Sequence, residues 1–243
     1  MILQPDFNIA GIYAGITTRQ GGVSQPPFDS FNLATHVGDE QSAVEQNRTL
    51  LVQRANLPHM PTFLNQTHSI DVVHLPSIET IPNADAAYTN QAGMVCAVLT
   101  ADCLPVLFAA KNAQEVAAAH AGWRGLCNGI LENTVAQFVS PASDIVAYLG
   151  PAIGSSAFQV GEEVREAFIC ANAEAASAFV IDPSAQDKYV ADIYQLARQR
   201  LQKCGITDIR GGTYCTVNDA RFFSYRRAKQ TGRMASFIYF NHR

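Results

Sequence analysis

Three residues whose side chains bind soft metals stand at the boundaries of apolar segments. His68 lies in "NQTHS", just before one such segment, Cys103 follows "GMVCAVLTAD", and His120 ends "EVAAAH". Thiolate and imidazole are ligands that suit zinc and copper. Three protein ligands leave a fourth coordination position for water or substrate, which distinguishes a catalytic zinc site from a structural one. The residue types are therefore compatible with a catalytic metal site, but their long spacings match no short metal-binding motif, and a buried cysteine is more often only packed in the core.

The same residues also suit a nucleophile that works without a metal. In this interpretation Cys103 attacks the substrate and His120 is its general base, with Asp102 or Asn32 orienting the histidine. A cytidine-deaminase site is excluded, because it needs H-x-E followed by P-C-x-x-C. A blue-copper site is disfavoured, because no histidines cluster beside a cysteine. The remaining histidines are weaker candidates for metal ligands. His36 is an intermediate candidate, and the weakest are His59, His74 and His242.

The segment "HAGWRGLCNGI" (120–130) offers groups that could hold an anion, although by itself it is more typical of an ordinary corner between a strand and a helix. Gly122 and Gly125 precede a predicted helix, and free N–H groups at a helix N-terminus bind anions. The guanidinium of Arg124 would add a bidentate contact. The alternative is an ordinary strand–turn–helix corner with a surface arginine. Trp123, the only tryptophan, could equally stack on a base or fill the core.

Two further segments carry positive charge. "TTRQGGVS" (17–24) is a glycine-rich turn with Arg19 at its lip. "FFSYRRAKQTGR" (222–233) contains Arg226 together with three other cations, which are Arg227, Lys229 and Arg233. The alternative for this second segment is a solvated basic loop. Asp85, in "ADAAYT", precedes an apolar strand and is interpreted as a turn cap.

Short apolar runs and helical periodicities predict the elements that would position these residues. Strands are expected at 11–18, 71–75, 93–100, 105–110, 115–120, 144–150, 209–215 and 234–240. Helices are expected at 42–57, 125–139, 161–172 and 187–204. The elements mix without strict βαβ alternation, which favours mixed sheets covered by helices in a single α/β (α+β) domain.

Composition excludes several classes of protein. Hydrophobic residues make up 48% of the 243 residues and charged residues 16%, with a net charge of −4, which is typical of a globular domain without a nucleic-acid or membrane footprint. The N-terminal residues form no secretory signal. The longest apolar region, 92–110, is too interrupted to span a bilayer. Six scattered cysteines without a C-x-x-C pair indicate reduced thiols in the cytoplasm.

Taken together, the motifs resemble one bacterial family. The chain is similar to the family called multicopper polyphenol oxidase, laccase-domain protein or peptidoglycan editing factor, whose members have also been described as purine nucleoside phosphorylases. The matching segments, in order, are "TTRQGGVS", "FDSFNLATHVGD", "NQTHS", "ADAAYTNQAG", "TADCLPVLF", "AAHAGWRG", "LGPAIG", "VGEEV" and "FFSYRRAKQTGR". They run from residue 17 to residue 233, so the resemblance covers nearly the whole chain as one domain, residues 1–243.

The resemblance implies a fold and a metal site. It implies a compact α/β/β/α sandwich of mixed sheets flanked by helices, similar to a bacterial toxin deamidase domain with a Cys–His site. Carried over residue by residue, the family's metal ligands fall on His68, Cys103 and His120, with zinc or copper as the metal. The family's activities are phosphorolysis of adenosine, inosine and methylthioadenosine, and deamination of adenosine.

The leading hypothesis is therefore a cytoplasmic purine nucleoside phosphorylase with adenosine deaminase activity, whose partners are a purine nucleoside and phosphate. The residues expected to contact substrate or phosphate are Arg19, Asn32, Arg124 and Arg226. Three alternatives remain: a copper-dependent polyphenol oxidase, a Cys–His hydrolase acting on a peptidoglycan precursor, and a non-catalytic metal-binding protein. No oligomeric state is predicted.

Overall fold

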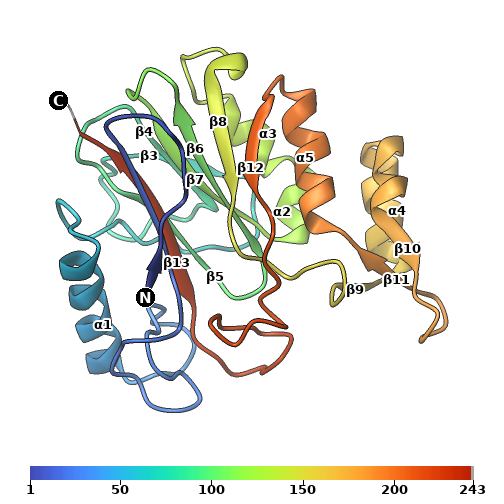
Figure 1. The fold of residues 1–243 in the computed structure, drawn as a ribbon, viewed down its shortest axis with the longest axis horizontal. Coiled ribbons are helices and arrows are strands. Elements are labelled where there is room, and N and C mark those ends of the chain that lie inside the picture. The colour runs from blue at the N-terminus through green and yellow to red at the C-terminus, as the bar shows by residue number, and fades with distance from the viewer. Residues whose placement is uncertain (242–243) are drawn as a thin grey trace.

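Three β-sheets organise the chain in the computed structural model, which describes residues 1–241 (Figure 1). His242 lies outside the described residues. The four-stranded sheet has the order β1-β2-β13-β5, and its strands are Ile2–Leu3, Ile12–Thr17, Met234–Phe240 and Cys96–Thr100. The six-stranded sheet has the order β12-β8-β6-β7-β4-β3, and its strands are Asp208–Gly211, Ile145–Leu149, Leu104–Ala110, Val116–Ala121, Ala86–Thr89 and Val72–His74. The small sheet has the order β10-β11-β9, and its strands are Phe179–Ile181, Lys188–Ala191 and Gln159–Gly161.

The two larger sheets pack face to face and helices cover their outer faces (Figure 1). Helix α1 (Gln41–Arg54) covers the four-stranded sheet. Helices α2 (Trp123–Asn128), α3 (Ile130–Val135) and α5 (Ile193–Lys203) cover the six-stranded sheet. Helix α4 (Glu162–Ala171) lies with the small sheet at one side of the molecule, and the two 3₁₀ helices are Ala142–Asp144 and Ala173–Ala178. The predicted α/β/β/α sandwich is confirmed.

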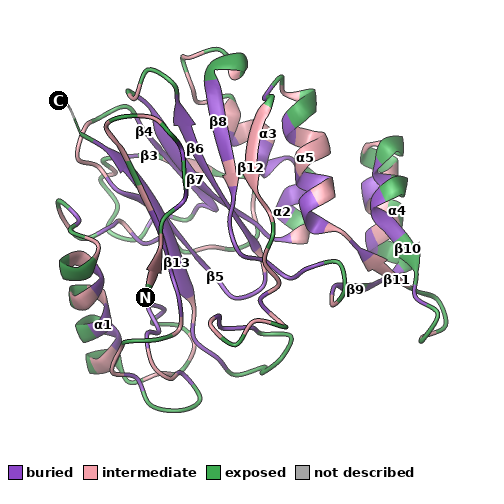
Figure 2. Cartoon of the chain, in the orientation of Figure 1, coloured by how far each residue is buried: buried purple, intermediate pink, exposed green. Residues whose placement is uncertain are grey.

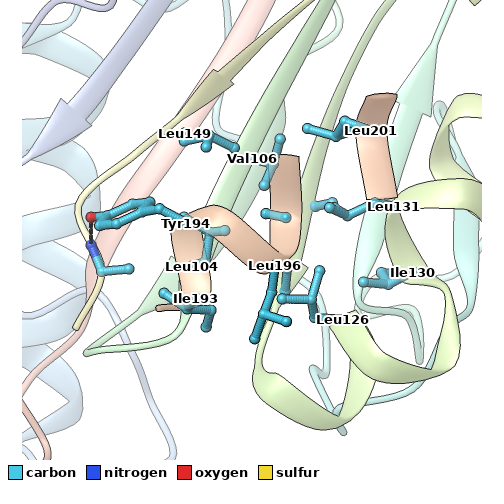
Figure 3. Close-up of a cluster of buried hydrophobic side chains, with 14 of the residues drawn as sticks. Leu104, Val106, Leu126, Ile130, Leu131, Leu149, Ile193, Tyr194, Leu196 and Leu201 are labelled. Carbon is cyan, nitrogen blue, oxygen red and sulfur yellow. Dashed lines mark hydrogen bonds between the residues drawn. The ribbon is translucent and has the colours of Figure 1, made fainter. Parts of the chain in front are cut away.

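The central strands are apolar on both faces because both faces are covered. Along β6, Leu104 and Phe108 point toward the helices, whereas Leu107 points toward the four-stranded sheet. Figure 2 shows these strands as buried along their length. Leu196 and Leu201 of α5 close the helix side of the core (Figure 3). This arrangement explains why the sequences of the central strands are continuous apolar runs rather than alternations of apolar and polar residues.

Pairing registers bring several chain segments to the same end of the sandwich. Residues 101–103 connect the end of β5 in one sheet to the start of β6 in the other. His120 pairs with Pro105, so the end of β7 lies beside the start of β6. Ala86 pairs with Ala119, which brings the start of β4 to the same edge. The segment before β13 also ends here, because Met234 pairs with Thr100.

Most predicted elements are confirmed with small shifts in their bounds, and three differ more. The helix expected at 125–139 begins at Trp123 and is broken at Gly129, whose φ of 108° is left-handed and suits glycine. The helix expected at 187–204 begins at Ile193, because Asp192 caps it by accepting from the backbone N–H of Gln195 and the residues before it form β11. The strand expected at 209–215 ends at Gly211.

No helix among residues 1–241 is both long and apolar enough to cross a membrane. The cytoplasmic location stays a prediction.

Candidate metal centre and adjoining cavity

His68, Cys103 and His120 converge at the end of the sandwich where the two sheets are connected. Their ligand atoms all lie within 4.8 Å of one another, and Cys103 Sγ is 3.7 Å from His68 Nε2. The rings of His68 and His120 meet edge to face with centroids 4.8 Å apart. Two ligands of a tetrahedral zinc ion with bonds of 2.0–2.3 Å are roughly 3.5 Å apart. The three side chains therefore fit one metal ion after small adjustments.

Asp85 holds two of these three ligands in position. Its carboxylate is fully buried and lies 2.7 Å from Nδ1 of His120, which leaves Nε2 of His120 for a metal. The same carboxylate accepts from the backbone N–H groups of Thr67, His68 and Ser69, at 3.0, 3.1 and 2.7 Å. His68 has a left-handed φ of 63°, a conformation that costs energy in a non-glycine residue. Asp85 thus stabilises the loop that presents His68 and orients His120, as carboxylates behind metal-bound histidines do.

Gly122 allows the chain to pass close to the same centre. A Cβ atom at this position would lie 2.5 Å from Cδ2 of His68 and 3.2 Å from Sγ of Cys103. Any larger residue would have to displace at least one of the two ligands. Close approach to the metal position therefore accounts for the glycine, and the anion-binding role of this turn stays a prediction.

The charges of the centre hold Cys103 as a thiolate when no metal is bound. Burial raises the pKa of the Cys103 thiol, but the charges and hydrogen bonds of His120 and His68 outweigh it and lower the pKa to about 6. Burial lowers the pKa of His120, but Cys103 and Asp85 outweigh it and raise the pKa to about 9. Burial likewise opposes ionisation of Asp85, whose pKa is lowered to about 2, chiefly by its hydrogen bond with His120. Thiolate and imidazolium therefore coexist between about pH 6 and pH 9.

We expect Cys103 to be the first cysteine alkylated in metal-free protein at neutral pH. The thiolate is the reactive form, so the rate should rise with a midpoint near pH 6, the value to which the pKa of Cys103 is lowered. Mass spectrometry of peptides after brief iodoacetamide treatment measures this rate, with exposed Cys170 as the internal comparison. A midpoint near the ordinary thiol pKa would contradict the proposed charge state of the centre.

Replacing Asp85 with asparagine is expected to weaken metal binding about 10- to 100-fold. An amide oxygen carries no full charge, so it stabilises His120 and the 67–69 backbone less well than the carboxylate. Competition with a chromogenic chelator measures the metal affinity, and circular dichroism checks that the variant folds. The nearby Asp71→Asn variant serves as the matched control, and an unchanged affinity in Asp85→Asn would remove Asp85 from this role.

A cavity of about 520 Å³ opens directly beside the three ligands, which form part of its wall. The aromatic surface of the cavity comes from Trp123, Phe158 and Tyr225. Its aliphatic surface comes from Leu99, Ile153 and Ile193. The cationic side chains that line it are Arg226 and Arg233, with His36 beside them. The volume is within the range typical of sites for small organic ligands. The cavity therefore combines an apolar region, a positively charged region and the candidate metal centre.

The predicted substrate-binding residues fall into two groups. Arg226 lines the cavity, and its backbone N–H donates to Asp102 Oδ2 at 2.6 Å. Asn32 is buried behind the wall, where its Oδ1 accepts from the backbone N–H of Arg233 at 3.0 Å. Arg19 pairs with Asp29 at 2.9 Å, and Arg124 lies over the Trp123 ring at 4.5 Å; neither lines the cavity. The role of each in binding stays a prediction.

Asp102 and Asn32 do not contact the imidazole that either was expected to orient. Asp102 accepts from the Thr216 hydroxyl at 2.5 Å, in addition to the Arg226 backbone N–H. Its φ of 93° places it in the left-handed region. Asp102 thus connects the 222–233 segment to the loop that carries Cys103, and Asp85 is the residue that orients His120. The only sequence signal for the role of Asp85 was its position directly before an apolar strand. Which side chains it contacts depends on the order of the strands in the sheet.

The comparisons with known proteins agree with the fold and identify a family. The profile of a family described as multi-copper polyphenol oxidoreductase laccase matches residues 13–241. A Haemophilus influenzae protein named purine nucleoside phosphorylase is 54% identical over 240 residues, 98% of each chain. An Escherichia coli protein named purine nucleoside phosphorylase YfiH is 55% identical and covers 94% of each chain. Relatives of nearly equal length thus carry the name of one enzyme.

Solved structures share the same fold. A Neisseria meningitidis protein assigned to the DUF152 family is 46% identical, with a TM-score of 0.93 and 99% of each chain covered. The structure of YlmD from Geobacillus stearothermophilus is 30% identical, with a TM-score of 0.84, and the match covers 98% of this chain and 94% of that one. These similarities extend over the whole sandwich, including the end that carries the candidate metal centre.

Proposed function

We propose, since this chain belongs to the multi-copper polyphenol oxidoreductase laccase family and its named relatives are purine nucleoside phosphorylases, that it cleaves purine nucleosides with phosphate. The substrates are adenosine, inosine and methylthioadenosine. The observation that carries the proposal is one cavity that offers aromatic walls and two arginines beside a His–Cys–His set. A purine ring, a phosphate ion and a reacting centre can occupy these three regions together.

Phosphorolysis requires that a phosphate oxygen bond to C1′ of the nucleoside while the bond from C1′ to the purine nitrogen breaks. The purine leaves with the bonding electrons and takes a proton, and the products are pentose 1-phosphate and the free base. The multiply charged phosphate must lose water to reach C1′, which is costly unless donors replace its hydration. Arg226 and Arg233 are the donors at the cavity wall. Trp123, Phe158 and Tyr225 offer the apolar surface against which a purine stacks.

Zinc or copper is the metal that we propose for the His68, Cys103 and His120 set, on the chemistry of its donors. When bound there, it supplies Lewis-acid chemistry at the edge of the cavity. This chemistry supports a second proposed activity, hydrolytic deamination of adenosine. The role of the chain is to hold the two imidazoles and the thiolate, with His120 oriented by Asp85.

A polyphenol oxidase is less well supported by the ligand set. Reduction of oxygen to water by a laccase needs several coupled copper ions. Among residues 1–241, one cluster of histidine, cysteine or acidic residues has the geometry to hold a metal ion. One such cluster suits a single ion, so we retain phosphorolysis as the main reaction.

A cysteine hydrolase is the alternative with a specific observation behind it. The nucleophile of such an enzyme would be Cys103, its base His120, and the residue that orients the base Asp85. The pKa of Cys103 is lowered to about 6. In that mechanism a metal would block the nucleophile and inhibit the enzyme. Addition of a chelator therefore separates the two functions, because it would activate a cysteine hydrolase and inactivate the proposed metal-dependent enzyme.

The proposed substrates are tested by incubating metal-loaded protein with adenosine, inosine or methylthioadenosine in the presence of phosphate. Chromatography of the products should reveal free base from each nucleoside and, from adenosine, additional inosine. Release of no base from any of the three would contradict the proposal.

A further inference from the structure

A second cavity adjoins the first and shares part of its wall. It has a volume of about 290 Å³ and is lined by His36, Val37, Lys229, Gln230, Thr231 and Arg233. His36 and Arg233 also line the larger cavity. The Arg233 side chain therefore borders both cavities and is within reach of a ligand in either one.

The wall of the second cavity carries positive charge, and no acidic side chain is among its lining residues. Within residues 1–241, neither Lys229 nor Arg233 forms an ion pair, and no acidic residue lines this cavity. The Asp39 carboxylate, which accepts from the Ser24 hydroxyl and the Asn32 amide at 2.6 and 2.9 Å, does not line this cavity. An anion that enters the second cavity is thus attracted by Lys229 and Arg233 without competition from a lining carboxylate.

Buried contacts hold this wall in place before any ligand binds. The Arg233 guanidinium donates to the carbonyls of Thr231 and Gly232, at 2.9 and 3.1 Å. Asn32 Oδ1 accepts from the backbone N–H of Arg233, and its amide nitrogen donates to the Ala34 carbonyl at 3.0 Å. A preformed wall lowers the entropy cost of binding. Asn32, predicted as a substrate contact, is better placed to support the anion-binding wall.

We propose that the second cavity is an additional anion subsite, and that the two cavities together bind two linked phosphoryl groups, as in pyrophosphate. One phosphoryl group occupies the position proposed above for orthophosphate, so the inference rests on the proposed function for that first position. The other phosphoryl group contacts Lys229 in the second cavity. Pyrophosphate is therefore bound more tightly than orthophosphate and competes with it.

Calorimetric titration of the metal-free full chain tests the subsite, because the absence of metal removes chelation by pyrophosphate. The expected result is that pyrophosphate binds at least about 10-fold more tightly than orthophosphate. Lys229→Ala should weaken pyrophosphate binding about 10-fold and change orthophosphate binding less than 2-fold, whereas Lys188→Ala, on an exposed strand position outside both cavities, should change neither. Lys229 is exposed, so its removal should leave the fold intact.

Two results would overturn the subsite: equal affinity for pyrophosphate and orthophosphate, or equal weakening of both by Lys229→Ala. A second titration, with adenosine diphosphate, tests whether the two linked phosphoryl groups belong to a nucleotide or to inorganic pyrophosphate. Tighter binding of adenosine diphosphate than of pyrophosphate supports a nucleotide ligand, and the reverse order supports an inorganic one. The titration contains no nucleoside substrate, so failure of phosphorolysis and failure of the subsite are separate outcomes.

Discussion

Cys103→Ala is expected to lose stoichiometric metal and to cleave inosine at least about 1000-fold more slowly than the wild type. The thiolate is the anionic ligand of the three, and two imidazoles alone bind zinc or copper far more weakly. A decrease of about 1000-fold in the rate of inosine cleavage corresponds to about 4 kcal/mol of transition-state stabilisation. Elemental analysis of the purified variant and initial rates at saturating phosphate measure the two effects.

Cys170→Ala is the matched control, because Cys170 is exposed on α4 and outside the centre. It should retain both metal and activity. Undiminished stoichiometric metal in Cys103→Ala would remove Cys103 from the ligand set. If that variant retained metal but lost activity, Cys103 would act on substrate rather than on the metal.

Arg233→Ala is expected to lower phosphate-dependent cleavage of inosine about 30- to 1000-fold. Arg233 lines both cavities and forms no ion pair among the described residues, so its charge is available to phosphate. Loss of one charged donor at a desolvated anion costs roughly 2–4 kcal/mol in the transition state. Adenosine deamination does not use phosphate and should fall much less. Parallel assays of the two reactions on one preparation provide the comparison.

Arg165→Ala is the control for this variant, because Arg165 lies over the Tyr189 ring and lines neither cavity. Its activities should match those of the wild type. Equal loss of both activities in Arg233→Ala would mean that Arg233 positions the nucleoside or the fold. Arg233→Lys should recover part of the phosphorolysis, since it restores the charge without the bidentate fork.

The sequence predicted elements well where local pattern determines them. The apolar runs at 93–100 and 105–110 are β5 and β6, and Cys103 lies in the connection between them, as expected. The helix predicted at 42–57 corresponds to α1. These segments are bounded by polar or glycine-containing turns, and both faces of their strands are covered, so the pattern and the packing agree.

Features that depend on the order of strands could not be predicted in the same way. Asp85 meets His120 because β4 and β7 pair antiparallel, a relation between segments that local periodicity does not contain. The choice between Arg124 and Arg233 at the cavity depends on side-chain direction: one lies over Trp123 and the other lines the wall. The break at Gly129 needed the backbone conformation, since glycine is tolerated within helices.

The most direct test of the account is inosine cleavage by metal-loaded protein as phosphate is varied from zero to saturation. Hypoxanthine release should require phosphate, saturate with it, and yield one pentose 1-phosphate per base released. Cleavage at full rate without phosphate, with free ribose as the product, would show a hydrolase and contradict the phosphorylase proposal.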